Sequence, residues 1–132
     1  MTESIFGKEE LRSAPILSLS FVGDAVHTLY VRTRFFTNVN KNNELHKLSA
    51  GECCAKNQAK AAKKLEAVLT EEEDFIFKKG KNAKVNTVPK NVSLYEYKQA
   101  TAFEAVIGYL YLSGNKERME ELIEMSYMEE EN

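Results

Sequence analysis

The sequence reads FVGDAV at residues 21–26, and this stretch decides the fold because it lies inside a helical pattern of apolar residues. Apolar side chains around it recur at intervals of three and four residues, which is the spacing of one helix face. Ser13 suits a helix cap and Pro15 suits a first helical turn. The pattern therefore predicts a helix over residues 16–36. Its apolar set is Phe21/Val22, Ala25/Val26, Leu29 and Phe36.

The rest of the chain also reads as helices joined by short loops, since proline and glycine are scarce and no strong run alternates with the period of a strand. Thr70 and Ser93 each begin a capping box, a sequence signal for a helix start. The further expected helices cover residues 43–69 with a break at Gly51, 70–80, 93–112 and 116–128. The predicted fold class is all-α, a single helical domain over residues 1–132 in which 1–12 and 129–132 are loosely ordered.

The amino-acid composition is that of a single globular domain. The chain has 132 residues, 43% of them hydrophobic, which suits one domain with its own core. No apolar stretch approaches the roughly 20 residues of a membrane span, and the N-terminus does not have the pattern of a secretory signal. The adjacent Cys53 and Cys54 do not suit a disulfide. We therefore expect a reduced, cytoplasmic protein without membrane association.

Charge is segregated along the chain although the formal net charge is only -2. Residues 30–64 hold eight lysines and arginines against two glutamates, and residues 75–98 hold six lysines against one glutamate. Acidic residues dominate residues 65–74 and 99–132. A locally basic face can bind a phosphate backbone even when the whole chain is acidic. The alternative is that these segments are ordinary solvated helix faces.

Two acidic residues occur among apolar ones. Asp24 lies in the middle of the first predicted helix and Glu104 in the middle of the helix predicted over 93–112, each with a glycine within one turn. A carboxylate in an apolar setting needs a cation, a metal or a proton. If the two helices pack side by side, both carboxylates can converge on a hard cation. The alternative is a buried aspartate that caps a backbone group and a glutamate paired with Lys90 or Lys98.

Residues 21–26 resemble the signature helix of the ribonuclease III catalytic domain, and TAFEAVIG at 101–108 is similar to the second acidic helix of that family. Within the family, the chain resembles most the short form, Mini-ribonuclease III, which lacks a double-stranded-RNA-binding domain. Further segments support this resemblance across nearly the whole chain. They are YVR at 30–32, LHKLS at 45–49, KGKNAK at 79–84 and PKN at 89–91.

The resemblance implies a magnesium-dependent homodimer that cleaves double-stranded RNA and leaves 5′-phosphate and 3′-hydroxyl ends. For the short form it implies maturation of the ends of the large-subunit (23S) ribosomal RNA precursor. Asp24 matches the catalytic aspartate and Glu104 the metal-binding glutamate, so both are expected to act in catalysis and to bind Mg²⁺. The longer enzymes have acidic residues where this chain has Ser20 and Thr101, and another near Asn42. Only two carboxylates of the fuller site are present.

A second candidate site is the basic segment 78–91, in which lysines alternate with asparagines and no acid occurs. Duplex RNA is recognised mainly through phosphate and 2′-hydroxyl contacts, for which such side chains suffice. The alternative is a solvated basic loop. The candidate RNA-binding residues are Lys78, Lys79, Lys81, Lys84, Lys90 and His46.

The expected assembly of the chain is a homodimer. Cutting both strands of a duplex requires two sites, which favours a homodimer. Phe35-Phe36 and the exposed part of the Tyr109–Leu112 segment are candidates for its interface. A ribosomal protein bound to the substrate is a further candidate partner. One rival function is a non-catalytic RNA-binding or ribosome-assembly module, and a second is a helical protein-interaction adaptor.

Overall fold

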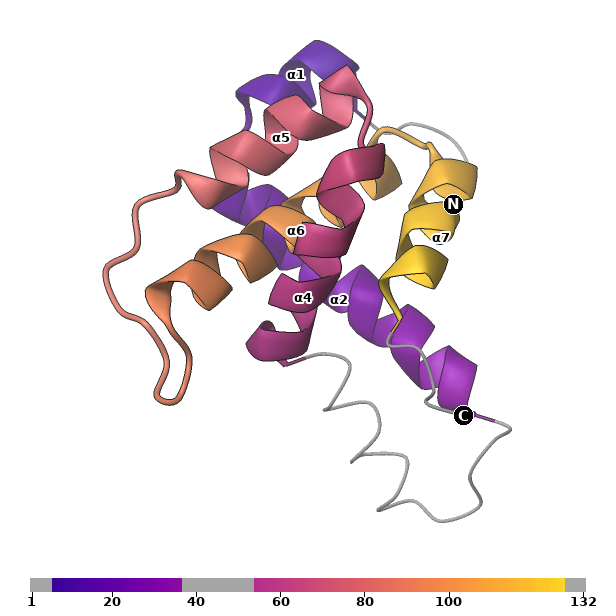
Figure 1. The fold of residues 1–132 in the computed structure, drawn as a ribbon. Helices are drawn as coiled ribbons and strands as arrows, with labels where there is room; N and C mark the ends of the chain where they lie inside the picture. The colour runs from indigo at the N-terminus through magenta and orange to yellow at the C-terminus, as the bar shows by residue number, and fades with distance from the viewer. Residues whose placement is uncertain (1–5, 37–53, 128–132) are drawn as a thin grey trace.

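The computed structural model describes residues 6–36 and 54–127, and every regular element within these two segments is helical (Figure 1). The fold class predicted from the sequence is confirmed. The elements are α1 (Lys8–Ser13), α2 (Ile16–Phe35), α4 (Ala55–Leu65), a 3₁₀ turn (Glu66–Val68), α5 (Glu71–Lys81), α6 (Leu94–Leu112) and α7 (Lys116–Ser126).

The central element is α6, which packs against α2, α4, α5 and α7. Side chains on all sides of α6 are therefore buried, and the core expected from the sequence is confirmed. Its predicted members are 3% exposed or less. They are Ala102, Phe103, Val106, Ile107 and Leu110. Because α6 is enclosed in this way, close packing restricts the orientations of its side chains.

Both predicted capping boxes are present. The Ser93 hydroxyl accepts a bond from the Glu96 amide at 3.0 Å, and the Glu96 carboxylate accepts one from the Ser93 amide at 3.0 Å. Thr70 and Glu73 repeat the arrangement at the start of α5. Each box satisfies backbone donors that a helix start leaves without partners, so the two signals fix where α5 and α6 begin.

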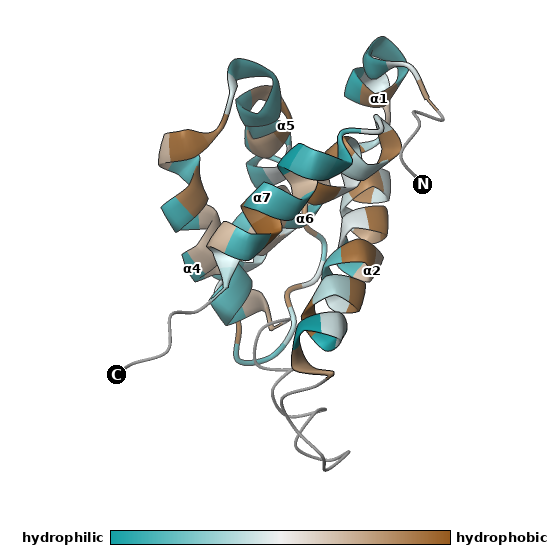
Figure 2. Cartoon of the chain, turned by 90° about the vertical axis from the view of Figure 1, so that its right-hand side faces the viewer, coloured by the Kyte–Doolittle hydropathy of each residue, from teal (hydrophilic) through white to brown (hydrophobic). Residues whose placement is uncertain are grey.

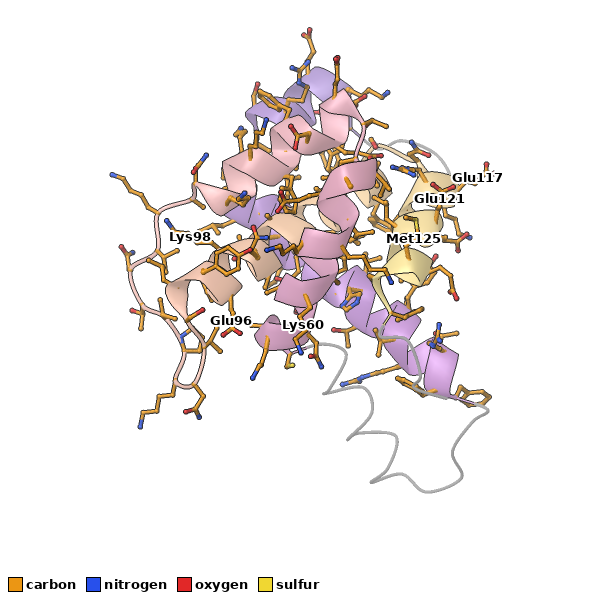
Figure 3. All side chains as sticks on the ribbon, in the orientation of Figure 1. Lys60, Glu96, Lys98, Glu117, Glu121 and Met125 are labelled. Atoms are coloured by element: carbon orange, nitrogen blue, oxygen red, sulfur yellow. The ribbon has the colours of Figure 1, made fainter. Side chains whose placement is uncertain are left out.

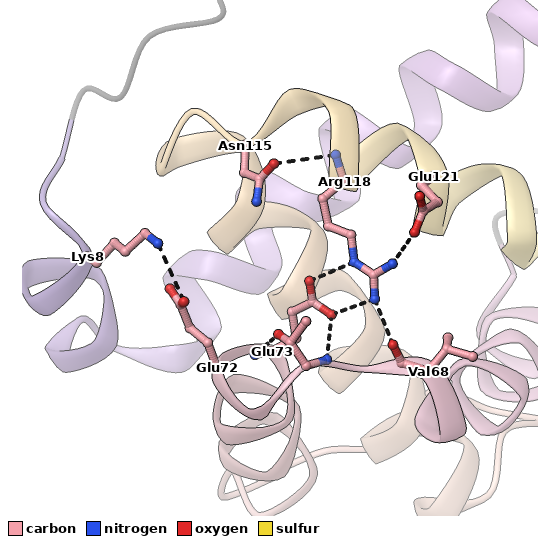
Figure 4. A network of polar contacts seen from close by, with 8 residues as sticks. Lys8, Val68, Glu72, Glu73, Asn115, Arg118 and Glu121 are labelled. Atoms are coloured by element: carbon pink, nitrogen blue, oxygen red, sulfur yellow. Dashed lines mark hydrogen bonds and ion pairs between the residues drawn. The ribbon is translucent and has the colours of Figure 1, made fainter.

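Glu73 also anchors α7 through Arg118 (Figure 4). The Arg118 Nε lies 2.9 Å from Glu73 Oε2, and another guanidinium nitrogen donates to the Val68 carbonyl at 2.7 Å. Although burial alone would raise the pKa of Glu73, bonds from Arg118 and Thr70 lower it. The charged pair therefore joins the start of α5 to α7.

The N-terminal segment differs from the expectation. Residues 8–13 form α1 instead of a loosely ordered end, because Leu11 is buried and Lys79 Nζ donates to the Arg12 carbonyl at 2.7 Å. Ser13 consequently ends α1 and does not cap α2, whose N-cap position is Pro15.

Three other helix ends also differ. Gly80 does not stop α5 but lies inside it, where a Cβ would come within 2.6 Å of Ala102 Cα. Glycine is there because α5 and α6 approach closely. The helix expected over 43–69 is seen from residue 55 and ends at Leu65, where the chain turns toward Thr70. Residues 43–53 of that prediction lie outside the described residues. The last helix ends at Ser126, not at residue 128.

The apolar stripe of α2 is largely exposed, contrary to the sequence-based expectation of a core face. Phe21 is 80% exposed, Leu29 63% and Phe36 75%. Figure 2 shows α2 at one edge of the molecule with hydrophobic residues along its length. Val26 of the predicted set is buried, and the side of α2 that faces the core also includes Leu19, Ser20, Gly23, His27 and Val31. Over the described residues, we find no helix with the length and apolar character needed to cross a membrane.

Candidate active site

The site is built where α2 crosses α6, and glycines allow the two backbones to touch. A Cβ on Gly23 would lie 1.7 Å from the Glu104 carbonyl oxygen, and one on Gly108 would lie 2.0 Å from the Leu19 carbonyl oxygen. Real Cβ atoms do not come so close, so neither position accepts another residue without moving the helices apart. The crossing brings Asp24, next to Gly23 in the chain, beside Glu104.

The two carboxyl groups meet at this crossing. Burial, a hydrogen bond with Asp24 and the charge of Asp24 together raise the pKa of Glu104 to about 9. Asp24 itself is exposed, which corrects the expectation that it lies on a core-facing stripe. Glu104 is half-buried. The pair therefore consists of an outer carboxyl group that solvent reaches and an inner one that the protein encloses.

Neutral donors hold the inner carboxyl group. The Ser20 hydroxyl donates to Glu104 Oε1 at 3.3 Å, and Gln58 Nε2 donates to Glu104 Oε2 at 3.3 Å. Among the described residues no lysine pairs with Glu104, so the alternative of an ion pair with Lys90 or Lys98 is wrong. Ser20, which stands where the longer enzymes have a glutamate, here contacts the glutamate of the pair.

Two further polar residues have partners that the sequence did not indicate. The Thr101 hydroxyl donates to the Tyr97 carbonyl at 2.9 Å, one turn back along α6. His27 is buried, its Nδ1 lies 3.2 Å from Gln58 Nε2, and its ring meets Phe103 edge-on. Burial lowers the pKa of His27 to about 4, although the charge of Asp24 acts in the opposite direction. The imidazole is therefore neutral at neutral pH.

The donor set at the crossing suits a small hard cation. Two carboxyl groups and a hydroxyl offer only oxygen, which is the ligand type of Mg²⁺. Among the described residues no cationic side chain pairs with these two acids, and two acids in contact share a proton or a metal ion. In residues 6–36 and 54–127 no group of three or more acids, histidines and cysteines is placed to hold a metal ion, so within these residues the site offers two carboxyl groups.

Comparison with known proteins agrees with this geometry. The family model of the ribonuclease III domain matches residues 17–115 of the sequence. Mini-ribonuclease 3 from Thermoanaerobacter sp. is 44% identical over 90% of this chain and 84% of its own length, and that from Brevibacillus brevis is 42% identical over 91% and 93%. A crystal structure of a Fusobacterium nucleatum protein superposes with a TM-score of 0.80 at 35% identity, over 87% of this chain and 93% of that one.

The chain belongs to the ribonuclease III family. Its relatives are Mini-ribonucleases 3, as the sequence resemblance predicted, and the protein is an endoribonuclease.

The lysines predicted to bind RNA in this ribonuclease III domain have different environments. Lys78 pairs with Asp74 at 2.8 Å, and Lys81 lies 3.9 Å from Glu66. Lys79 donates to α1, as described above. Lys84 and Lys90 lie exposed in the loop between α5 and α6. Among the described residues neither of these two has a bonded partner. The prediction for His46 falls outside the described residues, as does the position of Asn42.

A second group of lysines was not singled out by the sequence analysis. One face of α4 borders a groove of about 440 Å³ with the start of α6. In Figure 3, Lys60 on α4 and Glu96 on α6 mark this region. The lysines of the groove follow a helical spacing that could have indicated them. They are Lys56, Lys60, Lys63 and Lys64.

Proposed function

We propose that this endoribonuclease cleaves double-stranded RNA in a Mg²⁺-dependent reaction at a site formed by Asp24 and Glu104. The observation that carries the proposal is the contact between these two carboxyl groups, 80 residues apart in sequence, at a helix crossing that only glycine permits. Burying a carboxyl group such as that of Glu104 costs free energy, and acids with strongly shifted pKa values cluster at functional sites.

Asp24 and Glu104 would hold the ion, and the hydroxyl of Ser20 lies beside them. Bound Mg²⁺ would stabilise the charge on the phosphate and lower the pKa of a water that attacks it. The exposed Asp24 lets a phosphate of the duplex reach the pair from solvent. The enclosed Glu104 keeps its orientation because its oxygens are bonded on the protein side. In line with the family resemblance, the products would carry 5′-phosphate and 3′-hydroxyl ends.

The RNA would contact two basic regions. The loop between α5 and α6 offers Lys84 and Lys90, and the α4 groove offers four more lysines. Lys78, Lys79 and Lys81 at the end of α5 extend the proposed surface, and His46 is proposed as an RNA contact from the sequence alone. Lysines act on the phosphate backbone as flexible point charges, so these regions would position a duplex without reading its sequence.

A homodimer would present two such sites. The apolar residues of α2 support it, since Phe21, Ala25 and Leu29 line a groove of about 550 Å³ together with Tyr111 and Met119. Within the Tyr109–Leu112 segment suggested by the sequence, Tyr109 and Leu110 are buried in the core of their own chain, and Tyr111 lines this groove. An exposed apolar patch of this kind is typical of an interaction surface.

The resemblance to Mini-ribonucleases 3 supports a narrower proposal about the substrate. We propose the ends of the 23S ribosomal RNA precursor as that substrate, in the cytoplasm, with a ribosomal protein as a candidate partner on the RNA. The rival of a non-catalytic RNA-binding module predicts binding to the same surface without cleavage.

The test is a cleavage assay on duplex RNA with Mg²⁺, comparing the wild type with Asp24→Asn. This nearly isosteric change should lower the rate by at least about 100-fold while thermal stability and RNA binding in EDTA stay close to those of the wild type. Asp74, the other aspartate of the chain, gives the matched control, and Asp74→Asn should cut normally. Undiminished cleavage by Asp24→Asn would remove Asp24 from the mechanism, and a wild type that binds without cutting would favour the rival.

A further inference from the structure

A buried amide joins the proposed site to a third helix. Gln58, on α4, is 3% exposed, and its Nε2 lies 3.3 Å from Glu104 Oε2 and 3.2 Å from His27 Nδ1. An amide nitrogen carries two hydrogens and accepts no bond. Gln58 can therefore donate to the carboxylate and to the imidazole at the same time.

The orientation of this amide sets the tautomer of His27. Because the Gln58 nitrogen can only donate, His27 Nδ1 must accept, which places the proton of the neutral ring on Nε2. The Phe103 ring lies edge-on to the imidazole, with ring centroids 5.0 Å apart, and limits its rotation. In the reversed orientation the amide would turn its oxygen toward Glu104, whose carboxylate can only accept hydrogen bonds once it holds a metal ion.

We propose that Gln58 is a positioning residue of the site, which holds the Glu104 carboxylate in the orientation that faces Asp24 and a divalent cation. This inference rests on the proposed function. Groups that hold a metal ligand from behind set its direction, and their loss typically weakens metal binding by about 10–100-fold. Gln58 is buried whereas Glu104 is half-buried, and it bonds to Glu104 from α4.

If Gln58 had a purely structural role, replacing it would have the same effect as replacing another buried glutamine. The chain contains such a matched residue, which separates a structural role from a positioning role. Gln99 is also a buried glutamine, 1% exposed, whose Nε2 donates to a carboxylate, that of Glu66, at 3.0 Å. The described partners of Gln99 are Glu66 and Tyr95, and neither belongs to the Asp24–Glu104 pair. Replacing either glutamine by methionine removes an amide of similar length from a buried place, so the loss of stability should be similar.

The experiment compares Gln58→Met with Gln99→Met by three measurements. Mn²⁺ binding is followed by electron paramagnetic resonance without RNA, the Mg²⁺ concentration for half-maximal cleavage is determined on duplex RNA, and RNA affinity is measured in EDTA. For Gln58→Met we expect Mn²⁺ binding to weaken about 10-fold and the half-maximal Mg²⁺ concentration to rise by a similar factor, with RNA affinity in EDTA unchanged. Gln99→Met should keep wild-type values in all three.

Gln58→Asn, which keeps the donor but shortens its reach, should weaken Mn²⁺ binding in the same direction if Gln58→Met is too unstable to measure. Equal Mn²⁺ affinity for the Gln58 and Gln99 variants would overturn the inference, whether both match the wild type or both lose binding alike. A wild type that binds Mn²⁺ but does not cut duplex RNA would contradict the proposed function instead, and the Mn²⁺ comparison would still decide the role of Gln58.

Discussion

Glu104 holds a proton because of its surroundings at the helix crossing. Glu104 is enclosed by α2, α4 and α6, and its raised pKa of about 9 keeps a proton on it at neutral pH in the metal-free protein. Asp24 faces solvent. A cation that binds between them must displace the shared proton, so proton and metal ion compete for the same place. The arrangement explains how two acids can lie together in the folded protein before a metal ion arrives.

His27 gives a prediction about stability and pH. Its pKa lies at about 4 in the folded protein against 6.5 in the unfolded chain, because burial disfavours the charged ring. Well above pH 6.5 the ring is neutral in both states, so His27 adds no pH dependence to the free energy of unfolding. As the pH falls from 6.5 toward 4, only the unfolded chain takes up the proton, so the free energy of unfolding decreases, by about 3 kcal/mol at most.

The measurement is the free energy of unfolding of the wild type minus that of His27→Gln, from denaturant titrations between pH 4 and pH 8. Glutamine does not titrate, so other groups cancel in the difference. The difference should be level above about pH 7 and fall below pH 6.5. A difference that is constant down to pH 4 would mean that the buried ring titrates normally.

At the scale of elements, α2 has two faces with separate tasks. One face packs Leu19, Gly23 and Val26 against the core, and the other exposes Phe21 and Leu29. The exposed face is apolar although nothing within the described residues covers it. A second copy of the chain would bury it.

Phe21→Glu should therefore shift the protein from dimer to monomer, because a charge cannot be buried in an apolar interface without a partner. Sedimentation equilibrium would report this as a mass that falls from twice 15.0 kDa to 15.0 kDa. Leu94→Glu alters an apolar residue that is 51% exposed at the start of α6, outside this face, and should remain dimeric. A wild type that is monomeric at micromolar concentration, or a dimeric Phe21→Glu, would contradict the proposed interface.

Local signals were sufficient to predict α6 but not the environment of α2. The start of α6 is set by contacts three residues apart between Ser93 and Glu96, and its core residues are apolar on a helix enclosed by others. On α2 the apolar periodicity was correctly recognised as helical, but it did not reveal which face meets the core. The side of α2 that meets the core is the side that carries Gly23, because a residue without a side chain lets α2 pack closely against α6.

The candidate site was predictable only in part for a related reason. Asp24 and Glu104 stood out because acids are unusual among apolar residues, and the family resemblance paired them. Gln58 lies 46 residues from Glu104 in sequence, and the sequence does not show which residue it contacts. One signal was present: Gln58 interrupts an otherwise small and apolar stripe of Ala55, Ala59 and Ala62 on α4. A lone polar residue on such a face needs a buried partner.

In the whole molecule, three helices meet at the proposed active site. α2 brings Asp24 and Ser20, α6 brings Glu104, and α4 brings Gln58. The α4 groove and the loop between α5 and α6 are basic. The acidic residues of α7 lie on a different element, where Glu120 and Glu124 bond to Tyr30 and Arg34 of α2. This separation lets a chain with a net charge of -2 offer a basic surface to RNA.

The central claim is that two carboxylates form one divalent-metal site, and Mn²⁺ binding to four proteins tests it most directly. Electron paramagnetic resonance would follow Mn²⁺ binding to the wild type, Asp24→Asn, Glu104→Gln and the double variant. If the carboxylates share one ion, each single change should abolish binding almost as completely as both together, so the effects are strongly non-additive. Single losses that simply add up in free energy, or wild-type affinity in either single variant, would show that the two acids do not hold a common ion.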